Sequence, residues 1–149
     1  VEMVVTPDTM PAVGERRGSI GMVKPSGWHT VRDDSLDGKY LYNRCHLIAW
    51  CLSCMNAEER NLITGTRYMN VEGMLPYETQ VASYIERTGS SVLYKVTPDF
   101  RDNELVARGV RIQAQSVDGK DDELAFDVYC YNVQPGYAID YLTVAATKG

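Results

Sequence analysis

Apolar side chains in the second half of the chain recur first at three- and four-residue spacing. Over residues 76–87 this spacing is typical of an amphipathic helix. Pro76 fits the first turn of such a helix, where its missing N–H needs no partner, and Gly89 suits its end. The inner face of this helix is predicted to carry Val81, Tyr84, Ile85 and Thr88.

After this helix the apolar residues occupy every second position, which predicts three strands. A turn at Asp118-Gly119 is expected to join the second strand to the third. An antiparallel meander that follows a helix indicates an α+β domain. The residues that share one face are Val92, Tyr94 and Val96, then Val106, Val110, Ile112 and Ala114, then Leu124, Phe126, Val128 and Cys130. We expect the core to include Tyr84, Ile85, Val110, Ile112, Phe126 and Val128.

The first half of the chain has weaker sequence patterns for secondary structure. Residues 1–27 are rich in Gly, Pro and charge and are expected to be irregular, and a short strand is expected to begin at 28–31. Asp37-Gly38 indicates a turn before a strand over residues 40–47, which the central sheet should support. Residues 53–60 favour a short helix or turn, with Asn56 as its N-cap.

Length and composition are those of one soluble globular domain spanning residues 1–149. Apolar residues make up 44% of the chain and charged residues 23%, which excludes a disordered or fibrous protein. No run of 18 apolar residues predicts a membrane span, and no signal segment opens the chain. The net charge is −5, but residues 1–70 carry eight basic and eight acidic residues. A site for a polyanion should therefore lie in the first half.

The two histidines are His29 and His46, and the second has an arginine close by. In a strand, residues two apart share a face, so Arg44 and His46 point the same way, together with Tyr42. Arginine offers a charged fork of donors and histidine a base that is neutral near pH 7, a pair suited to phosphate. The alternative is a half-exposed strand with a purely structural histidine. The opposite face carries Leu41, Asn43, Cys45 and Leu47.

Three oxygen-bearing residues follow at wider spacing: Asn61, Asn70 and Glu78. Amide and carboxylate oxygens are hard ligands that suit Mg²⁺. Taken singly, each has a structural explanation. Asn61 could be a turn residue, Asn70 a helix entry, and Glu78 a favourable charge near a helix N-terminus.

Their order along the chain, however, resembles the ββα-metal fold and the DNA/RNA non-specific endonuclease family, in particular its branch of secreted streptococcal DNases and DNA-entry nucleases. The similar region runs from about residue 9 to about residue 143. The matching stretches are SIGMVKPSGW, LYNRCHLIAW, NLITGTRYMN, EGMLPYE and VRIQAQSVDGKDDELAFDVYCYNVQPGYAIDY. The resemblance implies a central antiparallel sheet flanked by helices.

It also implies metal-dependent hydrolysis of phosphodiester bonds. His46 corresponds to the general base of the family, and Asn70 to its metal-binding asparagine. Asn61 corresponds to the residue that positions the catalytic groups, and Arg44 to an arginine near the scissile phosphate. Glu78 corresponds to a glutamate that supports the hydrated metal.

Arg16 or Arg17 falls where the family places arginines that contact the substrate. The implied cofactor is Mg²⁺, which Mn²⁺ can replace. The implied substrate is DNA, with RNA left open, and the implied setting is a secreted bacterial protein. Neither a membrane nor an obligatory protein partner is implied.

The chain departs from the family pattern in two places. The commoner motif Asp-Arg-Gly-His reads Asn43-Arg44-Cys45-His46 here, which keeps the arginine and the histidine. An earlier strand with a Gly-Arg-x-Gly signature is not found, so we expect that the chain begins after that strand or that the strand is lost.

Rival interpretations involve the cysteines. Cys45, His46, Cys51 and Cys54 could supply a zinc site, but neighbours in a strand face opposite ways and no second Cys-x-x-Cys exists. A Cys–His hydrolase is weaker still, since Cys45 should point into the core. Cys51 and Cys54 could form a disulfide in a secreted protein. A nucleic-acid-binding domain without catalysis, or a toxin domain of the same fold, remains a further alternative.

Overall fold

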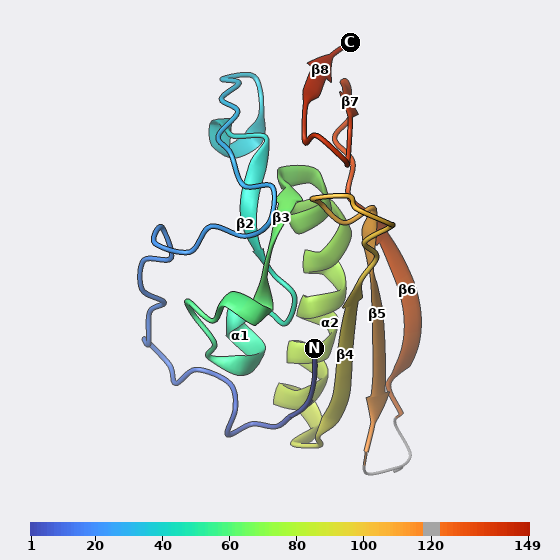
Figure 1. The fold of residues 1–149 in the computed structure, drawn as a ribbon. Helices are drawn as coiled ribbons and strands as arrows, with labels where there is room; N and C mark the ends of the chain where they lie inside the picture. Colours follow the sequence, from blue (N-terminus) through green and yellow to red (C-terminus); the bar gives the residue numbers. More distant parts are fainter. Residues whose placement is uncertain (118–122) are drawn as a thin grey trace.

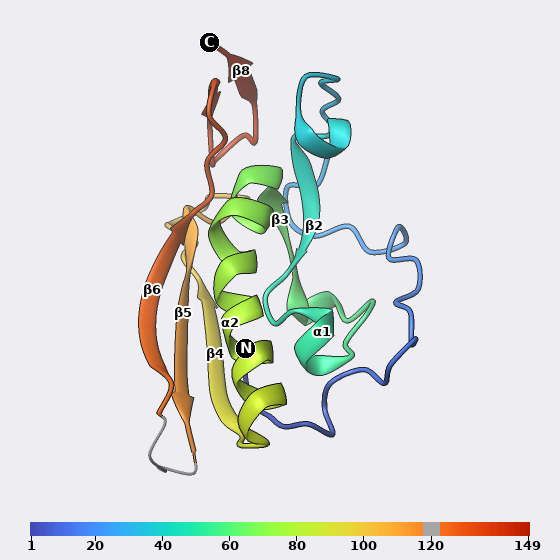
Figure 2. The same cartoon turned by 180° about the vertical axis from the view of Figure 1, so that it is seen from behind.

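The computed structural model describes residues 1–117 and 123–149, so the expected Asp118-Gly119 turn lies outside the described residues. Helix α2 (Leu75–Thr88) packs against one face of a four-stranded antiparallel sheet (Figures 1 and 2). Two further strands pair with each other on the opposite side of α2. The predicted α+β class is therefore confirmed. The sheet orders its strands as β1 (Glu2–Val5), β4 (Val92–Pro98), β5 (Gly109–Ser116) and β6 (Ala125–Tyr131).

Helix α2 forms where the periodicity predicted it. Pro76 lies in its first turn, and Gly89 ends it with a φ of 71°, a left-handed conformation that glycine adopts without strain. Val81, Tyr84 and Ile85 are buried as predicted. The prediction for Thr88 was wrong: this residue is exposed in the last turn, and its hydroxyl donates to the carbonyl of Tyr84.

Strands β4, β5 and β6 form the predicted antiparallel meander. Val110 and Ile112 are fully buried, whereas Phe126 and Val128 are half-buried and pack against the rim of the core. The reason is that β6 is an edge strand, where the ring of Phe126 packs on Tyr77 from α2, at 5.3 Å between centroids.

The first half contains the larger departures from expectation. Residues 2–5 were expected to be irregular but form β1, the other edge of the sheet. Residues 28–31 form no strand, and only an isolated bridge joins Arg32 to Tyr40 nearby. The strand predicted at 40–47 exists as β2 (Tyr42–His46), but it pairs with β3 (Leu62–Thr66) rather than with the central sheet.

A single short helix or turn was predicted at 53–60, but the structure has two short helical elements that flank this segment. These are the helix α1 (Trp50–Ser53) and a 3₁₀ turn, η2 (Glu59–Asn61). Asn56 lies in the loop between them and caps neither, because the cap of η2 is Glu58. None of the described helices is long and apolar enough to cross a membrane.

The side chain of Asn132 joins the two strand systems. Its oxygen accepts from the backbone N–H of Thr66 at 2.8 Å. Its amide group donates to the carbonyls of Thr64 at 3.2 Å and Ala107 at 3.0 Å. Asn132 is only 1% exposed, so water cannot replace these bonds. This residue therefore fastens β3 to the end of β6.

A small hairpin of β7 (Tyr137–Ile139) and β8 (Ala146–Lys148) completes the chain. Asp33 anchors it, since this carboxylate accepts from the Tyr137 hydroxyl at 2.6 Å and pairs with Lys148 at 2.9 Å. These partners hold the pKa of Asp33 far below its usual value. The loop before β2, including the short turn η1 (Asp37–Lys39), is thereby tied to the C-terminal hairpin.

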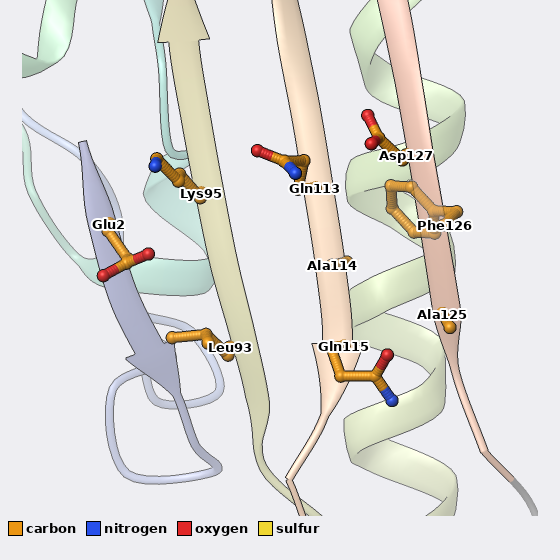
Figure 3. Close-up of a pocket in the computed structure, with 9 residues that line it drawn as sticks. All are labelled: Glu2, Leu93, Lys95, Gln113, Ala114, Gln115, Ala125, Phe126 and Asp127. Carbon is orange, nitrogen blue, oxygen red and sulfur yellow. The ribbon is translucent and has the colours of Figure 1, made fainter.

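The sheet face that points away from α2 is open and polar (Figure 3). Glu2, Lys95, Gln113 and Asp127 stand side by side across its four strands, and a hollow of about 570 Å³ lies over them. The residues with candidate chemistry lie elsewhere.

Removing the Asn132 side chain should destabilise the whole domain. Asn132→Ala leaves one buried N–H and two buried carbonyls without partners, and each such group costs about 1–3 kcal/mol. We expect the free energy of unfolding, measured by urea titration, to fall by roughly 3 kcal/mol. The exposed Asn103→Ala is the matched control. A loss below about 1 kcal/mol would contradict the fastening role.

Candidate active site

A cleft of about 690 Å³ opens between the loop at residues 17–20, strand β2 and the start of α2. Five of the predicted site residues line it: Arg17, Arg44, His46, Asn70 and Glu78. Asn61 is buried behind the cleft, and Arg16 is exposed and absent from its lining. The structure thus gathers residues that are spread over some sixty positions of the chain.

His46 is held in one tautomer at the end of β2. Its Nε2 lies 2.8 Å from the backbone carbonyl of Asn56. A carbonyl can only accept, so Nε2 carries the proton, and Nδ1 of the neutral ring is free to act as a base. Burial lowers the pKa of His46 below its usual value, and the positive charge of Arg17 lowers it further, while the Asn56 carbonyl opposes the shift. The ring is therefore neutral at physiological pH.

Asn61 holds the backbone that follows His46. Its side-chain oxygen accepts from the N–H of Ile48, and its amide group donates to the carbonyl of the same residue, both at 2.9 Å. Its own carbonyl accepts from the N–H of Leu47 at 2.8 Å. Asn61 therefore cannot reach a substrate, and the role that fits its contacts is positioning.

Arg44 is engaged with the protein itself. Its guanidinium donates to the carbonyls of Gly21 and Val23 and stacks on the ring of Trp28, with 4.1 Å from Cζ to the ring centroid. These contacts hold the loop that carries Arg17 beside the cleft. Five N–H groups are available on a guanidinium, so donors remain for a phosphate.

Asn70 lies in a π-helical turn, η3 (Met69–Met74), that runs directly into α2. Such turns are frequent at functional sites. The Asn70 oxygen lies 3.4 Å from the thiol of Cys45, and its amide group lies 3.4 Å from the side-chain oxygen of Asn43. Arg67 also approaches that Asn43 oxygen, at 3.5 Å, and pairs with Asp37.

The residue at the third motif position, Cys45, is buried as predicted. Burial raises the pKa of its thiol well above the usual value, so the group stays protonated and serves as a weak donor to Asn70. It lies against Gly65 of β3, where an added Cβ would stand 2.8 Å from the Cys45 Cβ. Glycine at position 65 therefore makes room for the cysteine.

Glu78 is buried at the floor of the cleft, only 5% exposed. Desolvation raises the pKa of this carboxyl to about 7. Its charged form thus needs a compensating positive charge. Asn70 and Glu78 both supply the oxygen donors that Mg²⁺ prefers, so the cleft fits a hydrated divalent cation.

The alternative sites built on cysteine receive less support from the geometry. All four cysteines are free, including Cys51 beside the cleft and the exposed Cys54. Within residues 1–117 and 123–149, no group of three or more His, Cys, Asp and Glu side chains could hold a metal ion.

A strand pair that carries a histidine, packed on a helix with a glutamate in its first turn and an asparagine in the π-helical turn that leads into it, is the arrangement of a ββα-metal nuclease fold. Comparison with known proteins gives the family: residues 15–118 match the model of the DNA/RNA non-specific endonuclease family, and the chain belongs to it.

Relatives and solved structures agree with this assignment. A deoxyribonuclease from Streptococcus dysgalactiae subsp. equisimilis is 34% identical over 107 residues, 68% of this chain. The match covers 32% of that protein, so this chain spans about a third of its curated relative. NucA from Streptococcus agalactiae, solved with a magnesium ion bound, superposes with a TM-score of 0.84 at 26% identity, covering 99% of this chain and 73% of that one. The Sda1 nuclease with a bound zinc ion gives 0.81 at 28% identity, covering 99% and 74%.

Three residues of the cleft region were missed at the level of sequence. Asn56, expected to be a helix cap, instead orients His46 through its carbonyl, and its side chain donates to the carbonyl of Ser19. The side-chain oxygen of Asn43 accepts from Asn70, and Arg67 approaches the same oxygen. The contact of a backbone carbonyl with His46 cannot be predicted from the residue types. The position of Arg67, three residues before Asn70, could have indicated that this arginine lies at the site.

Glu78 should make stability depend on pH in the absence of metal. Its carboxyl holds a proton up to about pH 7 in the folded state but only to about 4.5 when unfolded. Between these values the folded state binds more protons, so the free energy of unfolding falls as the pH rises, by about 3 kcal/mol for this group.

Urea titrations in EDTA at several pH values measure this loss. Glu78→Gln should abolish that part of the pH dependence, while Glu86→Gln, an exposed site on the same helix, should retain it. An identical pH profile for wild type and Glu78→Gln would show that Glu78 is not the titrating group.

Proposed function

We propose that this chain is a metal-dependent endonuclease that hydrolyses phosphodiester bonds of DNA without sequence preference. The observation that carries the proposal is the state of His46. The hydrogen bond from Nε2 to the Asn56 carbonyl leaves an unprotonated Nδ1 in a cleft shared with Arg17, Asn70 and Glu78. A neutral base beside cationic and oxygen-donor groups is what attack of water on a phosphate requires.

The roles follow from the contacts. His46 removes a proton from the attacking water through Nδ1, and the Asn56 carbonyl stabilises the imidazolium that forms. Arg17 contributes positive charge for the developing oxyanion, and Arg44 holds the loop on which Arg17 lies and offers its remaining donors to phosphate. Asn61 keeps the end of β2 in place by clamping Ile48.

Asn70 and Glu78 are the residues that would hold the metal, the first through its amide oxygen and the second directly or through water. A bound Mg²⁺ would supply further positive charge at the phosphate and lower the pKa of its coordinated water. Oxygen donors favour Mg²⁺, and Mn²⁺ accepts the same ligands. NucA with magnesium and Sda1 with zinc support metal dependence in general.

The same proposal extends to the substrate of the enzyme and to its location outside the cell. Contacts to phosphate carry no information on sequence, so cleavage should be non-specific. A relative named deoxyribonuclease favours DNA as the substrate, and RNA remains a second one to test. We further propose that residues 1–149 form one nuclease domain, that the protein is secreted, and that it acts without an obligatory protein partner.

His46→Ala should abolish cleavage and leave metal binding intact, because the imidazole is the base and not a ligand. Loss of a general base costs about 10²–10⁴ in rate. Plasmid nicking measures the loss, and calorimetric titration with Mg²⁺ measures the retained binding. His29→Ala is the matched control, since it alters the other histidine.

The wild-type pH profile provides a second readout. Because the pKa of His46 is lowered, the acid limb of kcat/KM should have its midpoint below 6.5, the usual value for histidine. Added imidazole should partly restore the activity of His46→Ala. Should His46→Ala lose Mg²⁺ binding as well, the ring is a ligand and the base lies elsewhere.

Asn70→Ala should lose Mg²⁺ affinity and activity together, since few other protein groups hold the ion. EDTA should silence the wild type, and Mg²⁺ or Mn²⁺ should restore it. Nicking gels and Mg²⁺ titrations measure both effects, with the exposed Asn103→Ala as control. Full activity in EDTA would refute metal dependence, and binding of DNA without any cleavage by the wild type would favour a non-catalytic domain.

A further inference from the structure

A second cavity lies next to the catalytic cleft. Its volume is about 370 Å³, which is within the range of sites that hold small ligands. Ile20, Asn43 and Arg44 line both this cavity and the cleft, so the two hollows share one wall. A strand of nucleic acid in the cleft can therefore continue into the cavity.

Aromatic rings and a guanidinium dominate the lining of this second cavity. Trp28 presents its ring there with the Arg44 guanidinium stacked on it, 4.1 Å from the ring centroid. Tyr40 lies on the wall as well and is 39% exposed, so its side chain is accessible to a ligand. Arg32, which is paired with Asp34, approaches the Tyr40 ring at 5.9 Å and adds a second guanidinium at the margin. Flat rings together with guanidinium groups are the surfaces on which unpaired nucleobases stack.

The direction of β2 places these rings along the expected path of the substrate. Tyr40, Tyr42, Arg44 and His46 follow one another at two-residue spacing, which puts them on the same side of an extended chain. At about 3.3 Å per residue, Tyr40 lies about 20 Å from His46. A stacked nucleic-acid strand advances 3.4 Å per nucleotide, so this distance corresponds to about six nucleotides and to fewer in an extended strand.

We propose that the cavity lined by Trp28, Tyr40 and Arg44 is a stacking subsite for an unpaired base of the substrate, several nucleotides from the scissile phosphate. This proposal rests on the nuclease function proposed above and specifies the substrate further. A base in a duplex is stacked and paired, so it must be flipped out before it can enter. The subsite therefore favours single-stranded or frayed nucleic acid over intact duplex.

Fluorescence tests binding without catalysis. The chain has two tryptophans, Trp28 in the subsite and Trp50 in the catalytic cleft, so Trp50→Phe leaves Trp28 as the only tryptophan. In EDTA, an oligothymidylate of about 12 nucleotides should quench this emission in a saturable way. A hairpin duplex of equal length should not. Tyr40→Leu in the same background should weaken binding of the single strand about tenfold, the typical loss for one stacked base.

Kinetics test the consequence for the substrate. Tyr40→Leu should lower the ratio of kcat/KM for single-stranded over duplex DNA about tenfold, whereas Tyr40→Phe keeps the ring and should keep the ratio. Tyr131→Leu removes an exposed tyrosine on β6, outside both cavities, and should also keep it. Absence of quenching by the single strand, or an equal loss on both substrates, would overturn the subsite. Plasmid nicking by the wild type reports separately on the proposed nuclease function.

Discussion

The burial of α2 between the four-stranded sheet and the β2–β3 pair determines the arrangement of the rest of the molecule (Figure 1). Apolar residues on either side of this helix pack against one of the two strand systems. A polar residue there is buried and needs a partner that compensates for its lost hydration. Glu78 is the one carboxylate of the helix that the fold draws inside, and it ends at the floor of the cleft. A group that costs free energy to ionise is thus placed where a cation would offset the cost.

Hydrogen bonds made by three asparagines hold this arrangement together. Asn132 joins β3 to the sheet, Asn61 fixes the chain after β2, and Asn56 presents the carbonyl that orients His46. Asn132 and Asn61 act through backbone groups of other segments, whereas Asn56 acts through its own carbonyl on the ring of His46. The contacts of Asn132 and Asn61 therefore tolerate changes of side chain in the segments that they hold.

The sequence predicts the parts of the molecule that depend on local pattern. Helix α2 and the meander of β4, β5 and β6 follow from periodicity, Pro76 and Gly89. Strand β3 was missed because its core, Thr64-Gly65-Thr66, is buried by long-range partners rather than by its own hydrophobicity. The same reason explains the wrong placement of β2, since alternation reveals a strand but not which strand lies beside it.

In the candidate site too, local sequence pattern predicts some features, whereas features that depend on long-range contacts are missed. Motif order identified five of the residues that line the cleft, because the spacing of chemically suited residue types can be recognised in a sequence. The engagement of Arg44 with Gly21, Val23 and Trp28 could not be predicted, since two of those contacts are with backbone carbonyls. The positioning role of Asn61 stays a prediction from the family resemblance, and its bonds to the backbone of Ile48 are the contacts through which it would act.

The contact between Cys45 and Gly65 carries a consequence for how this sequence can vary. The two positions are diagonal neighbours on β2 and β3, since Cys45 pairs with Ile63 and Gly65 with Asn43, and the cysteine side chain occupies the space between them. A chain with glycine at position 45, as in the commoner motif, frees only part of this volume, because a Cβ at position 65 would also stand 2.9 Å from the end of the Met69 side chain. Position 65 is therefore expected to vary together with both of these neighbours during evolution: β3 can gain a side chain there only where β2 loses one at position 45 and the Met69 side chain is replaced by a shorter one or moves.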